Sequence, residues 1–342
     1  MRQSSVICYL TSLRPNVPAS MADDQVRVVF EHLLRLGERP IKKLDVFLVS
    51  NGGSGTVPWR LVSVFREYSS SFNVLIPYRA YSAATMLALG ADEIVMHPFG
   101  ELGPIDPTVA NDFNPTHPNT GRTLGISVED VRAYVNFIKS TVGIRHEDEL
   151  VQAIGILANK VHPLALGNVE RFVAQSRMIA RKIMKTRQNR LDDHTIDEIV
   201  ENLASRLYFH GHPISRREAR DDLDLSSVVE EPGAQLENLM WQLYREYEIE
   251  FENDKVWDPE ADIFSLQSGD EGAARREIEY RLLHAMVESQ TMTSRNETIR
   301  RWTEFPIPNA PPGQTVLMER ILSQAWTHLE GAAAEDQRGP SS

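Results

Sequence analysis

The sequence predicts an α/β fold built on a parallel β-sheet with crossover helices. Short apolar segments alternate with amphipathic segments through the first hundred residues, which is typical of parallel strands joined by helices. The chain has 342 residues, of which 42% are hydrophobic. It is longer than one usual domain of about 100 to 200 residues, so we expect one large α/β unit with an added C-terminal part.

Four early segments have the continuous apolar character of strands that are covered on both faces. They are residues 5–13, 44–49, 72–77 and 93–96. Helices are expected between them. Residues 23–36 place Val26, Val29 and Leu33 on one helical face, and residues 59–68 repeat that spacing.

The rest of the chain is expected to be mostly helical. Residues 100–125 are rich in Pro, Asn, Thr and Gly, which predicts a long irregular loop near a site. Helices are expected at 128–139, 147–159, 166–185 and 195–207, and Pro232-Gly233 marks a boundary. These signals predict a main domain of residues 1–230, a mixed helical C-terminal extension of residues 231–330, and a disordered tail of residues 331–342.

Composition and charge exclude several classes of protein. The single cysteine, Cys8, excludes disulfide frameworks and cysteine-based zinc sites. A formal net charge of -12 argues against a nucleic-acid partner, because phosphate contacts require clustered Lys and Arg. No signal-peptide pattern and no apolar run of about 18 residues is present. We therefore predict a cytoplasmic protein with no nucleic-acid partner and no membrane span.

The first candidate motif is a glycine-rich turn, Ser-Asn-Gly-Gly-Ser-Gly, at residues 50–55, directly after the second expected strand. Gly52 and Gly53 lack a Cβ atom and can adopt positive φ, so their N–H groups could point into a cleft and stabilise an oxyanion. The same turn could bind phosphate or serve as a plain strand-to-helix connection. A Walker pattern is absent, because no Gly-Lys-Ser/Thr follows.

The second candidate motif centres on Ser82, where the third strand ends and a helix of small residues begins. A hydroxyl at a helix start lies near free N–H groups and the positive end of the helix dipole. Both favour the alkoxide that develops when a serine attacks a substrate. The alternative interpretation is an ordinary N-cap serine.

The joint order of the motifs resembles the Clp/crotonase superfamily. The Gly-Gly turn, Ser82 in its Ala-rich helix, the segment ALGADEIVM and the loop LGPIDP carry the resemblance, which covers about residues 5–225. Within this superfamily the chain is most similar to the serine dehydrogenase proteinase family, a relative of signal peptide peptidase A. The resemblance implies a Clp/crotonase-like sheet. It is weakest from Gln235 onward, where aromatic residues at helical spacing among acidic ones predict a mostly helical C-terminal extension.

The resemblance also implies a function. Ser82 matches the family's nucleophile, Gly52 and Gly53 match its oxyanion hole, and Gly103 lies where the chain borders the substrate groove. The implied activity is a serine endopeptidase that hydrolyses a peptide or protein substrate through an acyl-enzyme and needs no cofactor. Members of this fold usually assemble, so a homo-oligomer is implied.

The general base stays open at this point. Asp106 stands about where the Clp proteolytic subunit has a His, but a carboxylate with a pKa of about 3.9 is too weak a base for serine. The signal peptide peptidases use a lysine from a later helix, and Lys160 has the apolar neighbours that would keep a lysine neutral. Lys139 is the next lysine candidate. A histidine arrangement would use His97 or His162 with Asp106 as orienter.

Two rival functions also stay open. A crotonase-like acyl-CoA enzyme would share the oxyanion hole but use carboxylates and basic contacts to the CoA phosphates. A non-catalytic oligomeric scaffold would need Ser82 only as a helix cap. His210 and His212 flank Gly211 without a third ligand, so no metal is expected.

Overall fold

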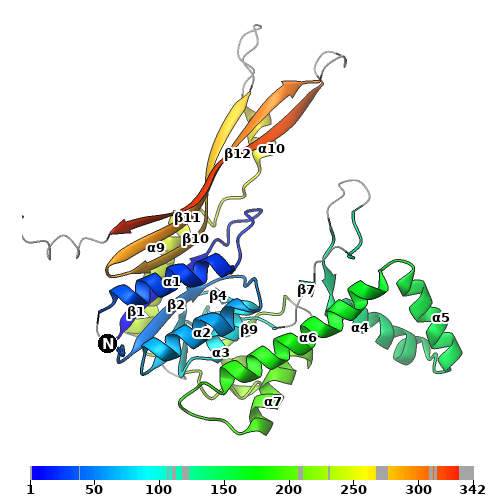
Figure 1. The fold of residues 1–342 in the computed structure, drawn as a ribbon, viewed down its shortest axis with the longest axis horizontal. Coiled ribbons are helices and arrows are strands. Elements are labelled where there is room, and N and C mark those ends of the chain that lie inside the picture. Colours follow the sequence, from blue (N-terminus) through cyan, green and yellow to red (C-terminus); the bar gives the residue numbers. More distant parts are fainter. Residues whose placement is uncertain are drawn as a thin grey trace, which may run out of the picture.

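The computed structural model describes residues 2–37, 39–105, 108–109, 113–117, 123–206, 211–229, 232–266, 276–307, 311 and 314–330. Within these residues, seven strands form one mixed sheet in the order β12-β11-β10-β1-β2-β3-β5 (Figure 1). The parallel part comprises β1 (Ser5–Thr11), β2 (Leu44–Val49), β3 (Phe72–Ile76) and β5 (Glu93–Met96). These four strands confirm the segments predicted from continuous apolar character.

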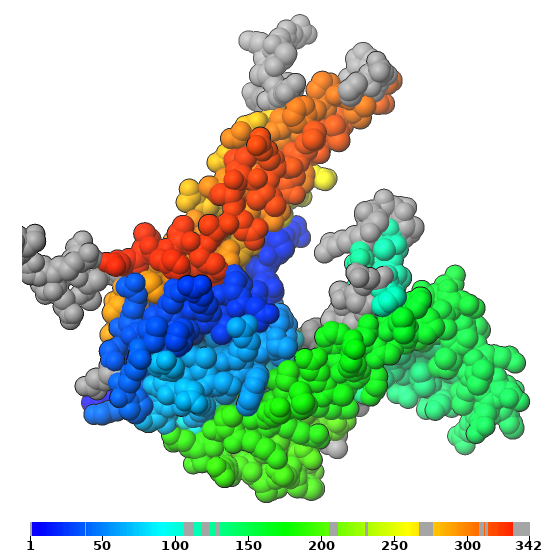
Figure 2. Space-filling view, in the orientation of Figure 1, coloured from blue at the N-terminus to red at the C-terminus, as the bar shows by residue number. Residues whose placement is uncertain are grey.

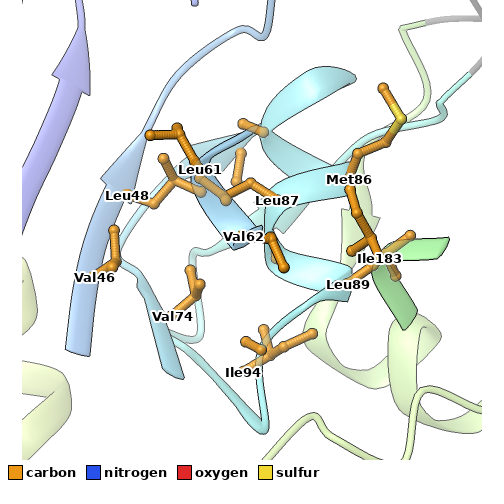
Figure 3. Packing of buried hydrophobic residues seen from close by; sticks show 14 of the residues in the cluster. Val46, Leu48, Leu61, Val62, Val74, Met86, Leu87, Leu89, Ile94 and Ile183 are labelled. Atoms are coloured by element: carbon orange, nitrogen blue, oxygen red, sulfur yellow. The ribbon is translucent and has the colours of Figure 1, made fainter. Parts of the chain in front are cut away.

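Helices cover both faces of the parallel strands. One face packs against α1 (Asp23–Arg35), α2 (Val57–Tyr68), α3 (Ala83–Leu89) and α6 (Pro163–Met184). The opposite face packs against α9 (Ala234–Glu250). Alternate residues of each strand face opposite sides of the sheet. Val46 and Leu48 lie in the cluster with Leu61 of α2 and Leu87 of α3 (Figure 3). Phe47 and Val49 lie in the cluster with α9 on the other side. Because the residues on both faces are apolar, the sequence of these strands shows no alternation of apolar and polar residues.

The C-terminal extension is mostly strand, and the prediction of a mostly helical extension was wrong. It contains β10 (Glu277–Ser289), β11 (Met292–Pro306) and β12 (Thr315–Glu330), with 13, 15 and 16 residues. Its helices α9 and α10 (Pro259–Ser265) have 17 and 7 residues. β10 pairs antiparallel with β1, so the extension continues the sheet of the main domain beyond the expected boundary at Pro232.

The error has a physical cause in the sequence of these strands. They project from the body of the molecule (Figure 1), and β12 is exposed along most of its length. Strand residues that stay exposed are often charged, and charged residues stand among the apolar ones along these strands. Bulges at Leu283/Ala285 and Ile299/Arg300 also change which residues face each side of the sheet along the strand. The aromatic residues at helical spacing, Trp241, Tyr244 and Tyr247, do lie in a helix, α9, but the strands after it carry no clear period-two pattern to indicate them.

The middle of the chain forms a helical arm. The arm comprises α4 (Val128–Asn136), a π-helical turn η1 (Phe137–Val142), α5 (Glu147–Ala158) and the first half of α6. Figure 2 shows this arm, in green, projecting from the body on a different side from the strand extension, in orange. α6 begins with Pro163, and the His162 side chain accepts the Leu164 N–H, which are ordinary helix-start signals.

The remaining elements are short. They are α7 (Asp193–Glu201), the π-helical turn η2 (Asn202–Arg206), α8 (Arg216–Asp221), β4 (Arg79–Ala80), β6 (Glu101–Leu102), β7 (Thr108–Val109), β8 (Ile126–Ser127) and β9 (Ile214–Ser215). The structure thus confirms the six helices predicted by residue range between 23 and 207, with ends shifted by a few residues, and the helix predicted to begin at Ser82. In the described part of the chain, no helix combines the length and apolar character needed to cross a bilayer.

A buried histidine joins α1 to the strand extension. His32 is fully buried, and its ring nitrogens Nδ1 and Nε2 lie 2.9 Å from the hydroxyls of Ser289 and Ser294. The Ser294 hydroxyl also lies 2.8 Å from Nδ1 of His328 on β12. Burial, followed by the nearby His328 and Arg35, lowers the pKa of His32 to about 4.

Acidification should therefore destabilise the fold. His32 has a pKa of about 4 in the folded chain and 6.5 when unperturbed, so as the pH falls the unfolded chain binds the proton first. Stability is lost between these two values, by about 3 kcal/mol in the free energy of unfolding. Denaturant titrations from about pH 7 to pH 4 should show a smaller loss in His32→Gln than in the wild type. Equal losses in both proteins would contradict this role of His32.

Candidate active site

Ser82 lies at the start of α3 with a strained backbone. Its φ is 52° and its ψ is -113°, a conformation that costs a residue with a side chain about 1 to 3 kcal/mol. The Ser82 side chain makes no capping hydrogen bond to α3, unlike an ordinary N-cap serine. Strain of this kind persists only where the neighbours fix it, and it is frequent at functional sites.

Ser82 opens into a cavity of about 390 Å³ between the glycine-rich turn and α6. Four apolar side chains contribute to its wall: Met86, Ile105, Phe172 and Ile179. The other lining residues are Asn51, Gly53, Ser54, Gly55, Thr56, Gln175 and Ser176. Among the described residues, no charged side chain lines this cavity. Such a wall suits an uncharged substrate group.

The glycine-rich turn packs directly on Ser82. Gly52 has a φ of 92°, and a Cβ at this position would lie 2.8 Å from the Ser82 Cβ and 3.0 Å from the Ala83 nitrogen. Gly53 has a φ of 154°, and a Cβ there would lie 2.4 Å from the Met21 carbonyl oxygen. Both positions therefore require glycine. The contact brings the two motifs of the sequence together at one site.

The N–H groups of this turn differ in their availability. The Gly52 N–H donates to Oγ of Ser50 at 3.0 Å, and Ser50 is held in turn by the Thr11 hydroxyl at 2.7 Å. The N–H groups of Gly53 and Ala83 have no acceptor within the described parts of the chain. Gly52 thus has a structural bond where an oxyanion donor was expected, whereas Gly53 and Ala83 flank the contact between Gly52 and Ser82 with N–H groups that no described residue accepts.

Sequence reasoning missed Ala83. A signal for it was present, because the first N–H groups of any helix lack intrahelical acceptors, and Ala83 is the first residue of α3. Gly103, expected at the edge of a substrate groove, packs against the Tyr81 ring. Its N–H donates to the Thr85 hydroxyl at 3.0 Å, and its carbonyl accepts from that hydroxyl at 2.8 Å.

The lysine candidates lie on the arm, away from the cavity wall. Lys160 follows α5 and is exposed, so the apolar enclosure expected around it is not present. Lys139 is exposed in η1. α6 begins at Pro163, three residues after Lys160. At a rise of about 1.5 Å per residue, Pro163 lies about 14 Å along α6 from Phe172, which lines the cavity. This separation exceeds the length of a lysine side chain.

The histidine candidates have structural contacts. His97 stacks on Trp241 with 5.1 Å between ring centroids, and its Nδ1 accepts the Phe99 N–H at 3.0 Å. Trp241 belongs to the α9 side of the sheet, whereas α3 packs on the other side. Burial, the largest effect, lowers the pKa of His97. Asp106 lies outside the described residues.

His162 and the paired histidines also have local partners. The His162 ring accepts the N–H of Leu164 at 3.2 Å and stacks on Phe113. His212 Nε2 lies 2.7 Å from Glu218, and His210 lies outside the described residues. No cluster of three metal-ligating side chains occurs in the described ranges.

Comparisons with known proteins cover only parts of the chain. No family model matches it. Two uncharacterized proteins of Methanocaldococcus jannaschii, MJ1495 and MJ0137, are each 30% identical over 66 residues, which is 19% of this chain and 23% of theirs. The match thus spans less than a quarter of each of these relatives.

Similar solved structures include the 1510-N membrane-bound stomatin-specific protease, as a serine-to-alanine variant and as a lysine-to-alanine variant with a substrate peptide. Each has 18% sequence identity and a TM-score of 0.24. The matches cover 34% of this chain and 54% and 51% of the respective neighbours. These neighbours are proteases. A likeness of this extent identifies no site residue in this chain, so the chemistry of the site rests on the geometry around Ser82.

Proposed function

We propose that this protein is a serine endopeptidase of the Clp/crotonase type with Ser82 as its nucleophile. The observation that carries the proposal is the strained Ser82, which makes no cap bond and lines a cavity beside two N–H groups that have no acceptor among the described residues. An ordinary helix cap has no need of such strain. A nucleophile at a turn between a strand and a helix needs a strained backbone, because the sharp turn exposes its oxygen to substrate.

In the proposed reaction, Ser82 Oγ attacks the carbonyl carbon of a peptide bond and loses its proton to a general base. The carbonyl oxygen becomes an oxyanion and accepts hydrogen bonds from the N–H groups of Gly53 and Ala83. Collapse of this intermediate expels the amine, which takes up a proton, and leaves an acyl ester on Ser82. Water then hydrolyses the ester and releases the carboxylic acid.

Lys160 is the proposed base, by resemblance to the signal peptide peptidases. Its exposed place after α5 means that a different position of the arm, or another copy of the chain, would have to bring it to Ser82. Oligomers are usual for this fold, so a homo-oligomer forms part of the proposal. The nucleophile and the oxyanion donors do not depend on this choice of base.

The rival functions have less support. A crotonase-like acyl-CoA enzyme needs carboxylates for proton transfer and basic groups for the CoA phosphates, yet no described residue on the cavity wall is charged. The scaffold alternative needs Ser82 only as a helix cap, but the Ser82 side chain makes no cap hydrogen bond to α3. The uncharged wall, with its four apolar side chains, instead suits a side chain of a peptide bound in extended form.

A mixture of unmodified peptides tests the function. After incubation with the wild-type protein, mass spectrometry should detect new peptide termini, and pretreatment with a fluorophosphonate should prevent their formation, because it consumes the nucleophile. A panel of acyl-CoA thioesters, assayed by thiol release, serves as the comparison. Thiol release without peptide cleavage would support the acyl-CoA enzyme, and inertness toward both substrate classes would support the scaffold.

A further inference from the structure

The strained turn at Ser82 requires neighbours that hold it in place, and Tyr81 is the neighbour on its N-terminal side. The Tyr81 backbone is fixed at both ends: its N–H donates to the Ser50 carbonyl at 2.9 Å, and its carbonyl accepts the Ala84 N–H at 2.9 Å. Its carbonyl would also lie 2.6 Å from any Cβ at Gly52. The peptide that precedes the nucleophile therefore has little freedom.

The Tyr81 side chain is fixed as well. Its hydroxyl donates to Oε2 of Glu101 at 2.5 Å, and its ring packs on Gly103, where a Cβ would lie 3.0 Å from the Tyr81 Cγ. The Arg79 guanidinium lies 5.6 Å from the Tyr81 ring centroid, and Arg79 Nε lies 3.7 Å from the same Glu101 oxygen. Burial, and then the bond to Glu101, raise the pKa of Tyr81, so the phenol stays protonated and remains a donor.

These contacts tie the residue before Ser82 to β6. The chain continues from β6 through Gly103 to Ile105, which lines the cavity. Without this anchor the Tyr81 ring and the Cα atom that carries it could shift together, and the peptide that leads into Ser82 would shift with them. Displacements of about 1 Å at a reacting group can cost about a hundredfold in rate.

We propose that Tyr81, through its hydrogen bond to Glu101, is a positioning residue that aims the Ser82 hydroxyl for attack. This role rests on the proposed function, because it presumes that Ser82 is the nucleophile. Tyr81 does not touch the reacting atoms in this role. It restricts Ser82 to the one backbone conformation in which the turn, Gly52 and α3 fit together.

The rate of fluorophosphonate labelling at Ser82 tests this role. Tyr81→Phe keeps the ring but loses the hydroxyl, and the second-order labelling rate should fall by about tenfold to a hundredfold, with the final stoichiometry unchanged. Glu101→Leu should slow labelling by the same factor, whereas Glu101→Gln keeps an acceptor and should stay within about twofold of the wild type. Because the two groups act through one bond, the double variant Tyr81→Phe/Glu101→Leu should be no slower than either single variant.

A matched control is available in the C-terminal extension. The Tyr280 hydroxyl donates to Oδ2 of Asp262 at 2.5 Å, in the same kind of bond far from Ser82 along the chain, and Tyr280→Phe should leave the labelling rate unchanged. Wild type and Tyr81→Phe labelling at equal rates would overturn the role of Tyr81 alone. Absence of any labelling of wild-type Ser82 would overturn the proposed function and this role with it.

Discussion

Ser82→Ala should reduce peptide hydrolysis to the background rate, a loss of about a millionfold if the serine is the nucleophile. The loss should be confined to this hydroxyl. Ser54 also lines the cavity and contacts the Thr56 hydroxyl, and Ser54→Ala should stay within a few-fold of the wild type in the same peptide assay. Cleavage by Ser82→Ala at the wild-type rate would remove Ser82 from the mechanism.

The strain at Ser82 makes a second comparison informative. Glycine adopts positive φ without penalty, so Ser82→Gly should be as inactive as Ser82→Ala but more stable by about 1 kcal/mol in the free energy of unfolding. Denaturant unfolding of the two variants measures this difference. A gain in stability together with a loss of activity is expected where a fold maintains strain for function.

Gly53→Ala should lower the turnover number by about a hundredfold to a thousandfold, the usual cost of losing one oxyanion donor. A Cβ at position 53 would meet the Met21 backbone at 2.4 and 2.5 Å, so the turn must shift and carry the Gly53 N–H with it. The apparent affinity for substrate should change much less, because the donor acts mainly in the transition state.

Two glycines serve as matched controls for Gly53. Gly55 also lines the cavity, but its nearest neighbour would be the Met86 Cε at 3.7 Å, so Gly55→Ala should retain activity. Gly37 has a φ of 90° with no atom within 4 Å, so Gly37→Ala measures the cost of positive φ without a clash. A Gly53→Ala protein that is folded and fully active would exclude the Gly53 N–H as an oxyanion donor.

The sequence predicted the parallel part of the fold well because its strands are buried on both faces. Residues 44–49 are all buried, and a short run of mostly apolar residues is typical of a parallel strand with helices on both sides. β12 is the opposite case, since most of its 16 residues are exposed and a bulge interrupts its pairing. Its position at the edge of the sheet depends on tertiary contacts, which a local sequence pattern does not indicate.

The residues of the candidate site also differ in how well the sequence predicted their positions. Ser82 and the glycine pair were predicted from neighbouring segments of the chain, and the structure places Gly52 against Ser82 because β2 and β3 are neighbours in the sheet. The base depended on the position of a helix from a distant part of the chain. Periodicity predicts that such a helix exists but not the direction in which it projects, and Lys160 lies on the arm rather than at the cavity.

The central claim is that Ser82 is a nucleophile, and covalent labelling measures this most directly. The intact wild-type protein, treated with a fluorophosphonate, should gain the mass of one adduct per chain. Proteolytic digestion and tandem mass spectrometry should place that adduct on Ser82, and the Ser82→Ala protein should gain none. An adduct on another residue, or a wild-type chain that remains unmodified while a known serine peptidase in the same tube is labelled, would contradict the claim.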